Sequence, residues 1–197
     1  MTARILVFAG SIRAGAFSGK TADAAARELA LQGAEVTRIS LADYPLPMLD
    51  QDLERERGVP ENAVRLAQMV DAHDGLLIAT PEYNASLPPL LKNTIDWISR
   101  VKTDARGRPF RAFSGKPVAL CSSSSGAYAG VRAITHLRSV LVHCQAEVVT
   151  PQCSVPRGAE AFRENGDFVE ERLQKAMAQV CAALIERARM FSRRAET

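Results

Sequence analysis

The chain has 197 residues and a formal net charge of +3, with 47% apolar and 24% charged residues. These values predict one globular domain over residues 1–197 with a substantial core. No apolar run approaches the roughly 18 residues that a membrane span needs, and no basic stripe interleaved with aromatic residues favours nucleic-acid binding. The start of the chain lacks a signal-peptide pattern, so we expect a cytoplasmic protein.

Short apolar runs alternate with longer helical patterns. In chain order we predict a strand over 4–9, a helix over 18–32, a strand over 35–40, a charged, proline-bearing connection over 44–58, a helix over 60–72 and a strand over 74–80. A helix over 88–101, a strand over 116–122, a helix over 130–143, a short strand over 146–150 and a last helix over 167–191 follow. This order predicts an α/β fold, a doubly wound, five-stranded parallel sheet in three α/β/α layers.

Ligands of such sheets bind at the carboxyl ends of the strands, near the topological switch point. The first loop there, 10–18, contains the parts of an anion cradle. Gly10 and Gly15 permit unusual backbone conformations, Ser11 and Ser18 offer hydroxyls, and Arg13 offers a charge-assisted bond to a phosphate. The alternative is an ordinary strand-to-helix turn, with Ser18 as the helix cap and Arg13 on the surface.

Two more loops leave the same predicted edge. In the loop 80–87, Pro81 ends the sheet pairing, Tyr83 offers an aromatic face with a hydroxyl, and Asn84 offers a two-sided amide. This combination suits a planar heterocycle, although a polar turn in which Asn84 supports the backbone is the alternative. The loop 122–130 is rich in serine and glycine, which allows either close approach to a ligand or a flexible connection.

A basic segment lies between the predicted helix over 88–101 and the predicted strand over 116–122. Residues 100–116 contain six basic residues against the single acid Asp104. This segment is either a solvated loop or a surface that attracts an anionic cosubstrate, which would favour NADPH over NADH through its 2′-phosphate. The four cysteines and three histidines show no metal-ligand spacing, so we expect free thiols and no metal site.

Four motifs together resemble the NADPH-dependent FMN reductase family, which includes flavodoxin-like quinone, chromate and azo-dye reductases. They are GSIR (10–13), TPEYN (80–84), LKNTIDW (91–97) and the Ser/Gly loop with Arg132 behind it. The resemblance spans about residues 4 to 140, and the block from PEYN to LKNTIDW is its specific part. It implies a flavodoxin-like fold, FMN as cofactor, NADPH or NADH as cosubstrate, and a homodimer or homotetramer.

The resemblance also implies site residues. The FMN phosphate is expected at Ser11, Arg13, Ser18 and the backbone of Phe17, and the isoalloxazine and ribityl at Pro81, Glu82, Tyr83 and Asn84. Ser122 and Ser123 are expected on the other side of the flavin. Ala16 and Ser18 replace polar residues common in the family, which predicts looser FMN binding.

The implied reaction needs no general base, because FMN itself accepts a hydride from NAD(P)H. The reduced flavin would then reduce a quinone, an azo compound, an oxyanion such as chromate, or free flavin, in a ping-pong scheme. A flavodoxin-type FMN electron carrier is the alternative, disfavoured by the mildly basic charge and the GSIR loop. A third alternative is a flavin-free interaction module of the same fold.

Overall fold

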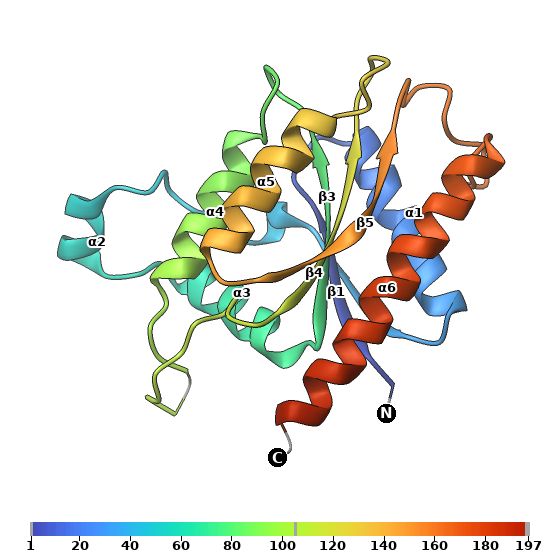
Figure 1. Ribbon diagram of the computed structural model, residues 1–197. Coiled ribbons are helices and arrows are strands. Elements are labelled where there is room, and N and C mark those ends of the chain that lie inside the picture. Colours follow the sequence, from blue (N-terminus) through green and yellow to red (C-terminus); the bar gives the residue numbers. More distant parts are fainter. Residues whose placement is uncertain (1, 105, 196–197) are drawn as a thin grey trace.

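The computed structural model describes residues 2–104 and 106–195, without the side chains of 192–195. Its centre is one all-parallel sheet of five strands in the order β2-β1-β3-β4-β5 (Figure 1). The strands are β1 (Arg4–Ala9), β2 (Glu35–Ile39), β3 (Gly75–Pro81), β4 (Pro117–Ser123) and β5 (Glu147–Val155). The predicted flavodoxin-like sheet is therefore confirmed.

Helices cover both faces of the sheet. They are α1 (Phe17–Leu31), α2 (Gln51–Arg57), α3 (Glu61–Ala72), α4 (Pro89–Arg100), α5 (Val131–His143) and α6 (Glu171–Ala195), with a short 3-10 turn at Leu41–Asp43. Helices α1 and α6 cover one face, α3, α4 and α5 cover the other, and α2 stands away from the sheet (Figure 1). Among the described residues, no helix is both long and apolar enough to cross a membrane.

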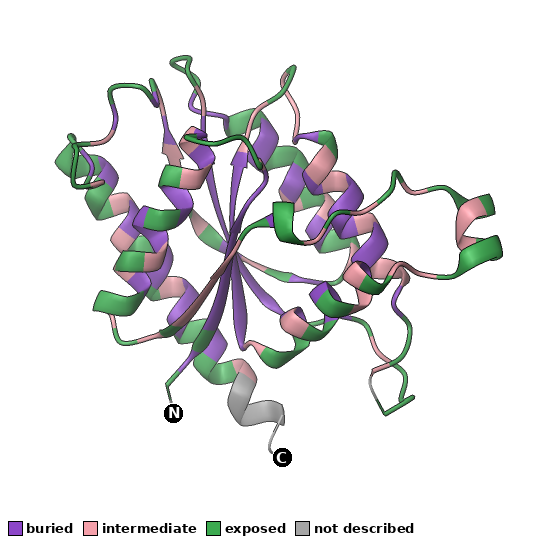
Figure 2. Cartoon of the chain, turned by 180° about the vertical axis from the view of Figure 1, so that it is seen from behind, coloured by how far each residue is buried: buried purple, intermediate pink, exposed green. Residues whose placement is uncertain are grey.

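The pleat of the strands divides the core into two layers. Ile5 and Val7 of β1 pack with α1 and α6, whereas Leu6 and Phe8 pack with the helices of the opposite face, as the period of two requires. The buried strands run through the middle of the molecule in Figure 2. Strand β3 is buried at nearly every position, which explains its continuous apolar sequence.

Three elements differ from the sequence prediction. The connection 44–58 contains helix α2, which has Asp50 as its N-cap and Gly58 as its C-cap. This helix buries no residue, so the sequence has no apolar stripe there to reveal it. Strand β5 continues past Pro151, because it is an edge strand with a register shift against β4, where proline is tolerated. Helix α6 begins four residues late, because Phe168 pairs with Phe162 in an isolated bridge.

The LKNTIDW motif fastens the proline-bearing connection to α4. The buried Asn93 amide donates to the Pro47 carbonyl at 2.8 Å and accepts from the Leu49 N–H at 2.8 Å. The Trp97 indole N–H donates to the same Pro47 carbonyl at 2.7 Å. These three bonds give the motif a structural role, because they hold the connection 44–58 against α4.

At the amino edge of the sheet, Lys116 is a buried cation with only 3% of its surface exposed. Its ammonium donates to the His73 carbonyl at 2.5 Å and lies 4.5 Å from the centroid of the Phe191 ring. Burial lowers the pKa of this ammonium from 10.5 to about 8, although the Asp71 and Asp74 carboxylates oppose the shift. Lys116 therefore joins α6 to the sheet at an electrostatic cost.

Replacing Lys116 by Met tests this cost. Between pH 8 and 10.5 the unfolded chain holds a proton that the folded protein has lost, so this group makes the free energy of unfolding rise with pH in that window. The difference in unfolding free energy, wild type minus Lys116→Met, should rise by about 2–3 kcal/mol from pH 7.5 to pH 10. Urea titrations measure it. Lys175→Met, at an exposed position of α6, is the control, and an equally flat difference for both variants would contradict the assignment.

Candidate functional site

A pocket of about 190 Å³ opens at the carboxyl edge of the sheet. The chain leaves β1 toward α1 on one face and leaves the neighbouring β3 toward α4 on the other, which opens a crevice between their loops. Eight of the ten predicted residues line it: Ser11, Arg13, Phe17, Ser18, Pro81, Glu82, Tyr83 and Ser123. Ala16, Ser124 and Ser125 complete the lining, while Asn84 and Ser122 are not part of it.

The loop from β1 to α1 turns so that a helix N-terminus faces the pocket. Gly15 has a φ of +67°, and the Ala16 N–H closes the turn on the Arg13 carbonyl at 3.1 Å. Ala16 is the N-cap of α1 and provides no side-chain acceptor, so the alternative in which Ser18 is the helix cap is wrong. The first turn also contains no acidic residue, which leaves its N–H groups available for an anion.

Two buried hydroxyls in the pocket lining have no hydrogen-bond partner. Ser18 and Ser123 are each 1% exposed, and their Oγ atoms are the only buried side-chain nitrogen or oxygen atoms without a partner among the described residues. They come from α1 and β4, on different walls of the same pocket. Because an unsatisfied buried hydroxyl is costly, two of them in residues that line one pocket favour a polar ligand there.

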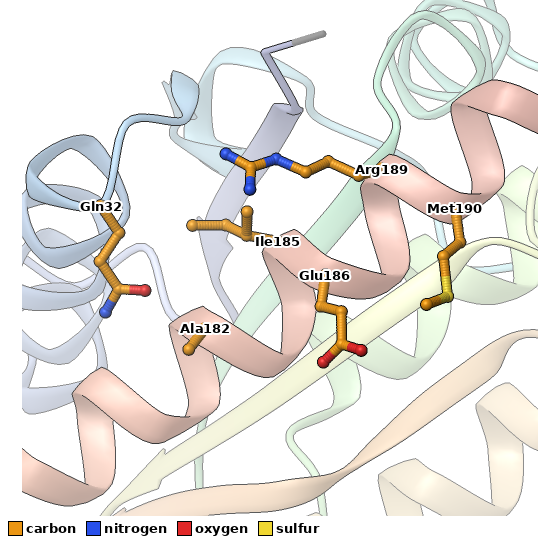
Figure 3. Close-up of a pocket in the computed structure, with 6 residues that line it drawn as sticks. All are labelled: Gln32, Ala182, Ile185, Glu186, Arg189 and Met190. Atoms are coloured by element: carbon orange, nitrogen blue, oxygen red, sulfur yellow. The ribbon is translucent and has the colours of Figure 1, made fainter.

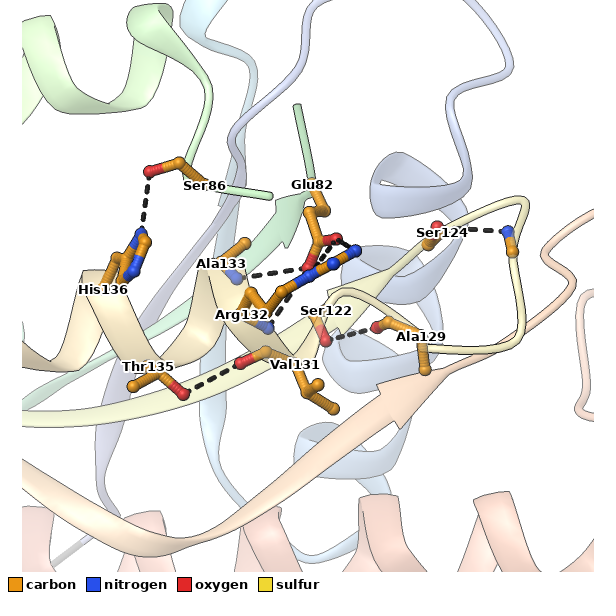
Figure 4. A network of polar contacts seen from close by, with 11 residues as sticks. Glu82, Ser86, Ser122, Ser124, Ala129, Val131, Arg132, Ala133, Thr135 and His136 are labelled. Atoms are coloured by element: carbon orange, nitrogen blue, oxygen red, sulfur yellow. Dashed lines mark hydrogen bonds and ion pairs between the residues drawn. The ribbon is translucent and has the colours of Figure 1, made fainter. Parts of the chain in front are cut away.

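The Glu82 carboxylate is already fully engaged (Figure 4). It accepts the N–H groups of Arg132 at 3.1 Å and Ala133 at 3.3 Å, at the start of α5, and it forms an ion pair with the Arg132 guanidinium. That guanidinium lies 5.3 Å from the centroid of the Tyr128 ring. Burial raises the pKa of Glu82, but the bonds from Arg132 and Ala133 outweigh it and hold this pKa below its usual range. Glu82 thus joins the second loop to the third as a carboxylate.

Tyr83 and Asn84 lie on a tight hairpin turn. The backbones of Tyr83 and Ser86 exchange two hydrogen bonds, of 2.9 and 3.0 Å, and Asn84 and Ala85 both have positive φ values of 48° and 64°. This is the geometry of a type I′ turn, which asparagine tolerates well. The turn is fastened to α5 by a contact of 2.9 Å between the Ser86 hydroxyl and the His136 ring (Figure 4). Asn84 therefore lies exposed at the tip of the hairpin, while Tyr83 faces the pocket.

Ser122 and Ser123 point to opposite sides of β4. The buried Ser122 hydroxyl donates to the Ala129 carbonyl at 2.6 Å, which fastens the third loop to its own strand (Figure 4). Gly130 at the end of that loop has a φ of +80°, and a Cβ there would lie 2.9 Å from the Ser122 Cβ. The structure thus separates the two serines by the strand period, with only Ser123 on the pocket side.

The basic segment lies far from this pocket. It connects α4 to the start of β4 at the amino edge, opposite the carboxyl-edge loops (Figure 1). Arg108 is paired with Asp104, Arg100 with Glu54, and Lys116 is buried. The interpretation that this segment attracts a cosubstrate to the site is therefore contradicted by its position.

Another hollow, of about 330 Å³, lies between the end of α1 and the last turns of α6 (Figure 3). Its polar groups are Gln32, Glu186 and Arg189. None of its lining residues comes from a loop at the carboxyl end of a strand. No unpartnered buried hydroxyl faces it among the described residues. It therefore lacks the features that mark the carboxyl-edge pocket.

None of the four cysteines lines the carboxyl-edge pocket. Burial raises the pKa of the Cys121 thiol in β4, and its neighbour Cys153 raises it further, so this thiol remains protonated. The described part of the chain contains no group of three or more His, Cys, Asp or Glu side chains placed to hold a metal ion.

Sequence reasoning missed Arg132 as a partner of Glu82, and it missed the loop after β5 altogether. That loop packs on the pocket wall through Gly158, whose N–H donates to the Ser124 carbonyl at 2.9 Å. Arg132 follows the Ser/Gly loop at the start of a helix, which was a usable signal. The segment around Gly158 has no motif that could have revealed it.

The fold and the pocket define an α/β protein with a polar pocket at its β1/β3 switch point. A family model described as NADPH-dependent FMN reductase matches residues 3–160, and the chain belongs to this family. A quinone reductase of Escherichia coli K12 is 39% identical over 147 residues, which cover 74% of this chain and 73% of that protein. An NAD(P)H-dependent FMN reductase of Pseudomonas aeruginosa is 32% identical over 183 residues, 92% of each chain.

A solved structure shows the same arrangement. The flavoenzyme NAD(P)H:(acceptor) oxidoreductase FerB from Paracoccus denitrificans superposes with a TM-score of 0.79 at 25% identity, covering 96% of this chain and 99% of that chain. Family membership confirms the predicted resemblance and makes the protein an NAD(P)H-dependent flavin oxidoreductase with FMN as cofactor. The electron-carrier and flavin-free alternatives are therefore set aside.

Replacing Glu82 by Ala should remove the acceptor that satisfies two N–H groups at the start of α5. We expect the free energy of unfolding to fall by about 1–2 kcal/mol, the usual cost of losing a helix cap. Since the folded-state pKa of Glu82 lies below 4.5, this stabilisation is present above that pH and is lost as the pH falls through the lowered pKa.

Denaturant unfolding at neutral pH measures this loss. The control is Glu171→Ala, which breaks an exposed ion pair with Lys175 and should change stability by less than about 0.5 kcal/mol. Equal stability of the Glu82→Ala variant and the wild type would show that the carboxylate does not hold the two loops together.

Proposed function

We propose that the carboxyl-edge pocket holds the FMN phosphate at the N-terminus of α1 and the flavin ring beside the second loop. The observation that carries this proposal is the pair of buried, unpartnered hydroxyls of Ser18 and Ser123. FMN has a phosphate, a ribityl chain and a polar ring edge, each of which can bond a hydroxyl. The residues present therefore fit the cofactor of the family.

Each predicted residue receives a specific role in this proposal. Ser11, Arg13 and Ser18 bind the phosphate through their side chains, and Phe17 binds it through its N–H. Pro81 and Tyr83 lie against the flavin ring, while Glu82 and Asn84 contribute backbone groups, because the Glu82 carboxylate is engaged and Asn84 lies at the tip of the turn. Ser123 contributes its hydroxyl, and Ser122 supports it from the other side of β4.

FMN, when bound, accepts a hydride from NAD(P)H and passes electrons to a second substrate. The protein's part is to bind and orient, since the one carboxylate in the pocket lining is held in an ion pair and no histidine lines the pocket. Donor and acceptor would use the same space in turn, a ping-pong scheme. Relatives named quinone reductase and 2-hydroxy-1,4-benzoquinone reductase favour a quinone as acceptor, with azo compounds, oxyanions and free flavin as other candidates.

A second copy of the chain would complete the site. The pocket of about 190 Å³ is smaller than the roughly 300–1,000 Å³ typical of ligand sites. Tyr83, Tyr128 and Ile12, in the loops around it, are exposed by 48%, 72% and 54%. Exposed aromatic and aliphatic groups of this kind are typical of interfaces, so we propose a homodimer or homotetramer. The four free cysteines support a cytoplasmic location.

The test of this function is a visible spectrum of the FMN-loaded protein before and after anaerobic addition of NADPH or NADH. We expect the bound-flavin absorbance to bleach within seconds and to return when a quinone is added. Bound flavin that ignores both nucleotides would refute the reductase assignment. Absence of flavin binding would refute the pocket itself.

Arg13→Ala should weaken FMN binding by about 1.5–3 kcal/mol, the range of a hydrogen bond to a charged group. Fluorescence titration with FMN measures the change. Arg57→Ala, in the outlying helix α2, is the matched control and should bind FMN as the wild type does. An unchanged affinity in Arg13→Ala would remove this residue from the phosphate site.

Ser18→Ala separates stability from binding. In the absence of FMN, removing an unpartnered buried hydroxyl should leave the free energy of unfolding unchanged or raise it by up to about 1 kcal/mol. FMN affinity should nevertheless fall about tenfold. Denaturant unfolding of the FMN-free protein and FMN titration measure the two effects. A marked loss of stability together with full FMN affinity would show that the hydroxyl serves the fold instead of the ligand.

A further inference from the structure

The end of β5 and the residues directly after it, 155–158, contact two walls of the pocket at once. On one side it bonds the third loop: the Ser124 N–H donates to the Val155 carbonyl at 3.1 Å, the Gly158 N–H donates to the Ser124 carbonyl at 2.9 Å, and the Arg157 N–H donates to the Gly126 carbonyl at 3.2 Å. Ser124 itself lines the pocket. The segment 155–158 is therefore fixed to the pocket wall that β4 supplies.

On its other side the same segment presses on the start of α1. A Cβ placed on Gly158 would lie 2.4 Å from Cγ, 2.6 Å from Cδ2 and 2.8 Å from Cβ of Phe17. Gly158 is buried and is not among the residues with positive φ, so glycine is required here for space and not for backbone conformation. Arg157, just before it, has a left-handed φ of 45°, a strained value for a non-glycine residue.

This contact lies close to the backbone of Phe17. Rotation of the phenyl ring cannot relieve the contact between the added methyl group and the Phe17 Cβ, so any side chain at position 158 must increase the separation between this segment and the first residue of α1. Phe17 is both the first residue of that helix and a pocket residue, and Ser18 with its unpartnered hydroxyl follows it directly. A shift of Phe17 therefore also moves the N–H groups of the first turn of α1 and the Ser18 hydroxyl.

We infer that Gly158 is a positioning residue for the phosphate end of the cofactor site. The segment 155–158 sets the separation between the first turn of α1 and the third loop, and a bare backbone at Gly158 lets the two walls approach closely enough to hold a phosphate between them. This inference rests on the proposed function, since it assumes that the phosphate binds at the start of α1. Binding groups generally have to be held to within about 0.5 Å, so the displacement forced by one methyl group is enough to matter.

The test compares FMN with riboflavin, which lacks the phosphate, in the wild type and in Gly158→Ala. The wild type should bind FMN more tightly than riboflavin. In Gly158→Ala the FMN affinity should fall about tenfold or more while riboflavin affinity stays nearly constant, so that the ratio of the two affinities collapses. A general weakening of the fold would lower both affinities and leave the ratio unchanged.

Two further variants sharpen the comparison. Ala159→Ser adds one atom at the exposed neighbouring position and should keep the wild-type ratio. Phe17→Ala removes the ring but keeps the Cβ that would lie 2.8 Å from the added methyl group, so in this background Gly158→Ala should lower the ratio by less than it does in the wild type. If the single variant Gly158→Ala does not fold, the single variant Phe17→Ala tests the inference instead. Its ratio of FMN to riboflavin affinity should fall if the contact positions α1, and an unchanged ratio would overturn the inference.

The outcomes separate this inference from the function on which it rests. A wild type that binds FMN and riboflavin equally well refutes the phosphate site and the inference with it. A wild type that prefers FMN, together with a folded Gly158→Ala that keeps the full preference, refutes the positioning role alone.

Discussion

The order of the strands is the constraint on which the site depends. Because β1 and β3 are neighbours and their connections leave for opposite faces, no helix covers the gap between their carboxyl ends. The start of α1 and the second loop border that gap, and β4 contributes its last residue, Ser123, from the next strand. The pocket is thus a direct result of topology, and the residues placed there decide what it can hold.

The polar groups around the pocket fall into two sets. One set is satisfied within the protein: Glu82 with Arg132 and the start of α5, Ser122 with Ala129, and Ser86 with His136. These bonds fasten the second and third loops to α5 and β4. The other set, the Ser18 and Ser123 hydroxyls and the uncapped N-terminus of α1, is unsatisfied. The satisfied groups fix the second and third loops in place, and the unsatisfied groups are available to bind a ligand.

The sequence predicted the sheet and the three loops well, because buried parallel strands and helix-start signals are local. It failed where tertiary context decides: β5 runs through Pro151 only because it is an edge strand, and α6 starts late because Phe168 pairs with Phe162. Among the site residues, the direction of each serine on β4 and the engagement of Glu82 depend on partners distant in sequence. The contact of Gly158 with Phe17 has no sequence signature at all.

The central claim is that the unpartnered groups of the pocket bind the phosphate and the polar parts of FMN. A crystal structure of the protein with FMN tests it most directly. We predict that the phosphate lies within hydrogen-bond distance of the Ser18 hydroxyl and the N–H groups of Phe17 and Ser18, and that the Ser123 hydroxyl bonds another part of the cofactor. A flavin bound elsewhere, with both hydroxyls still unpartnered, would contradict the account.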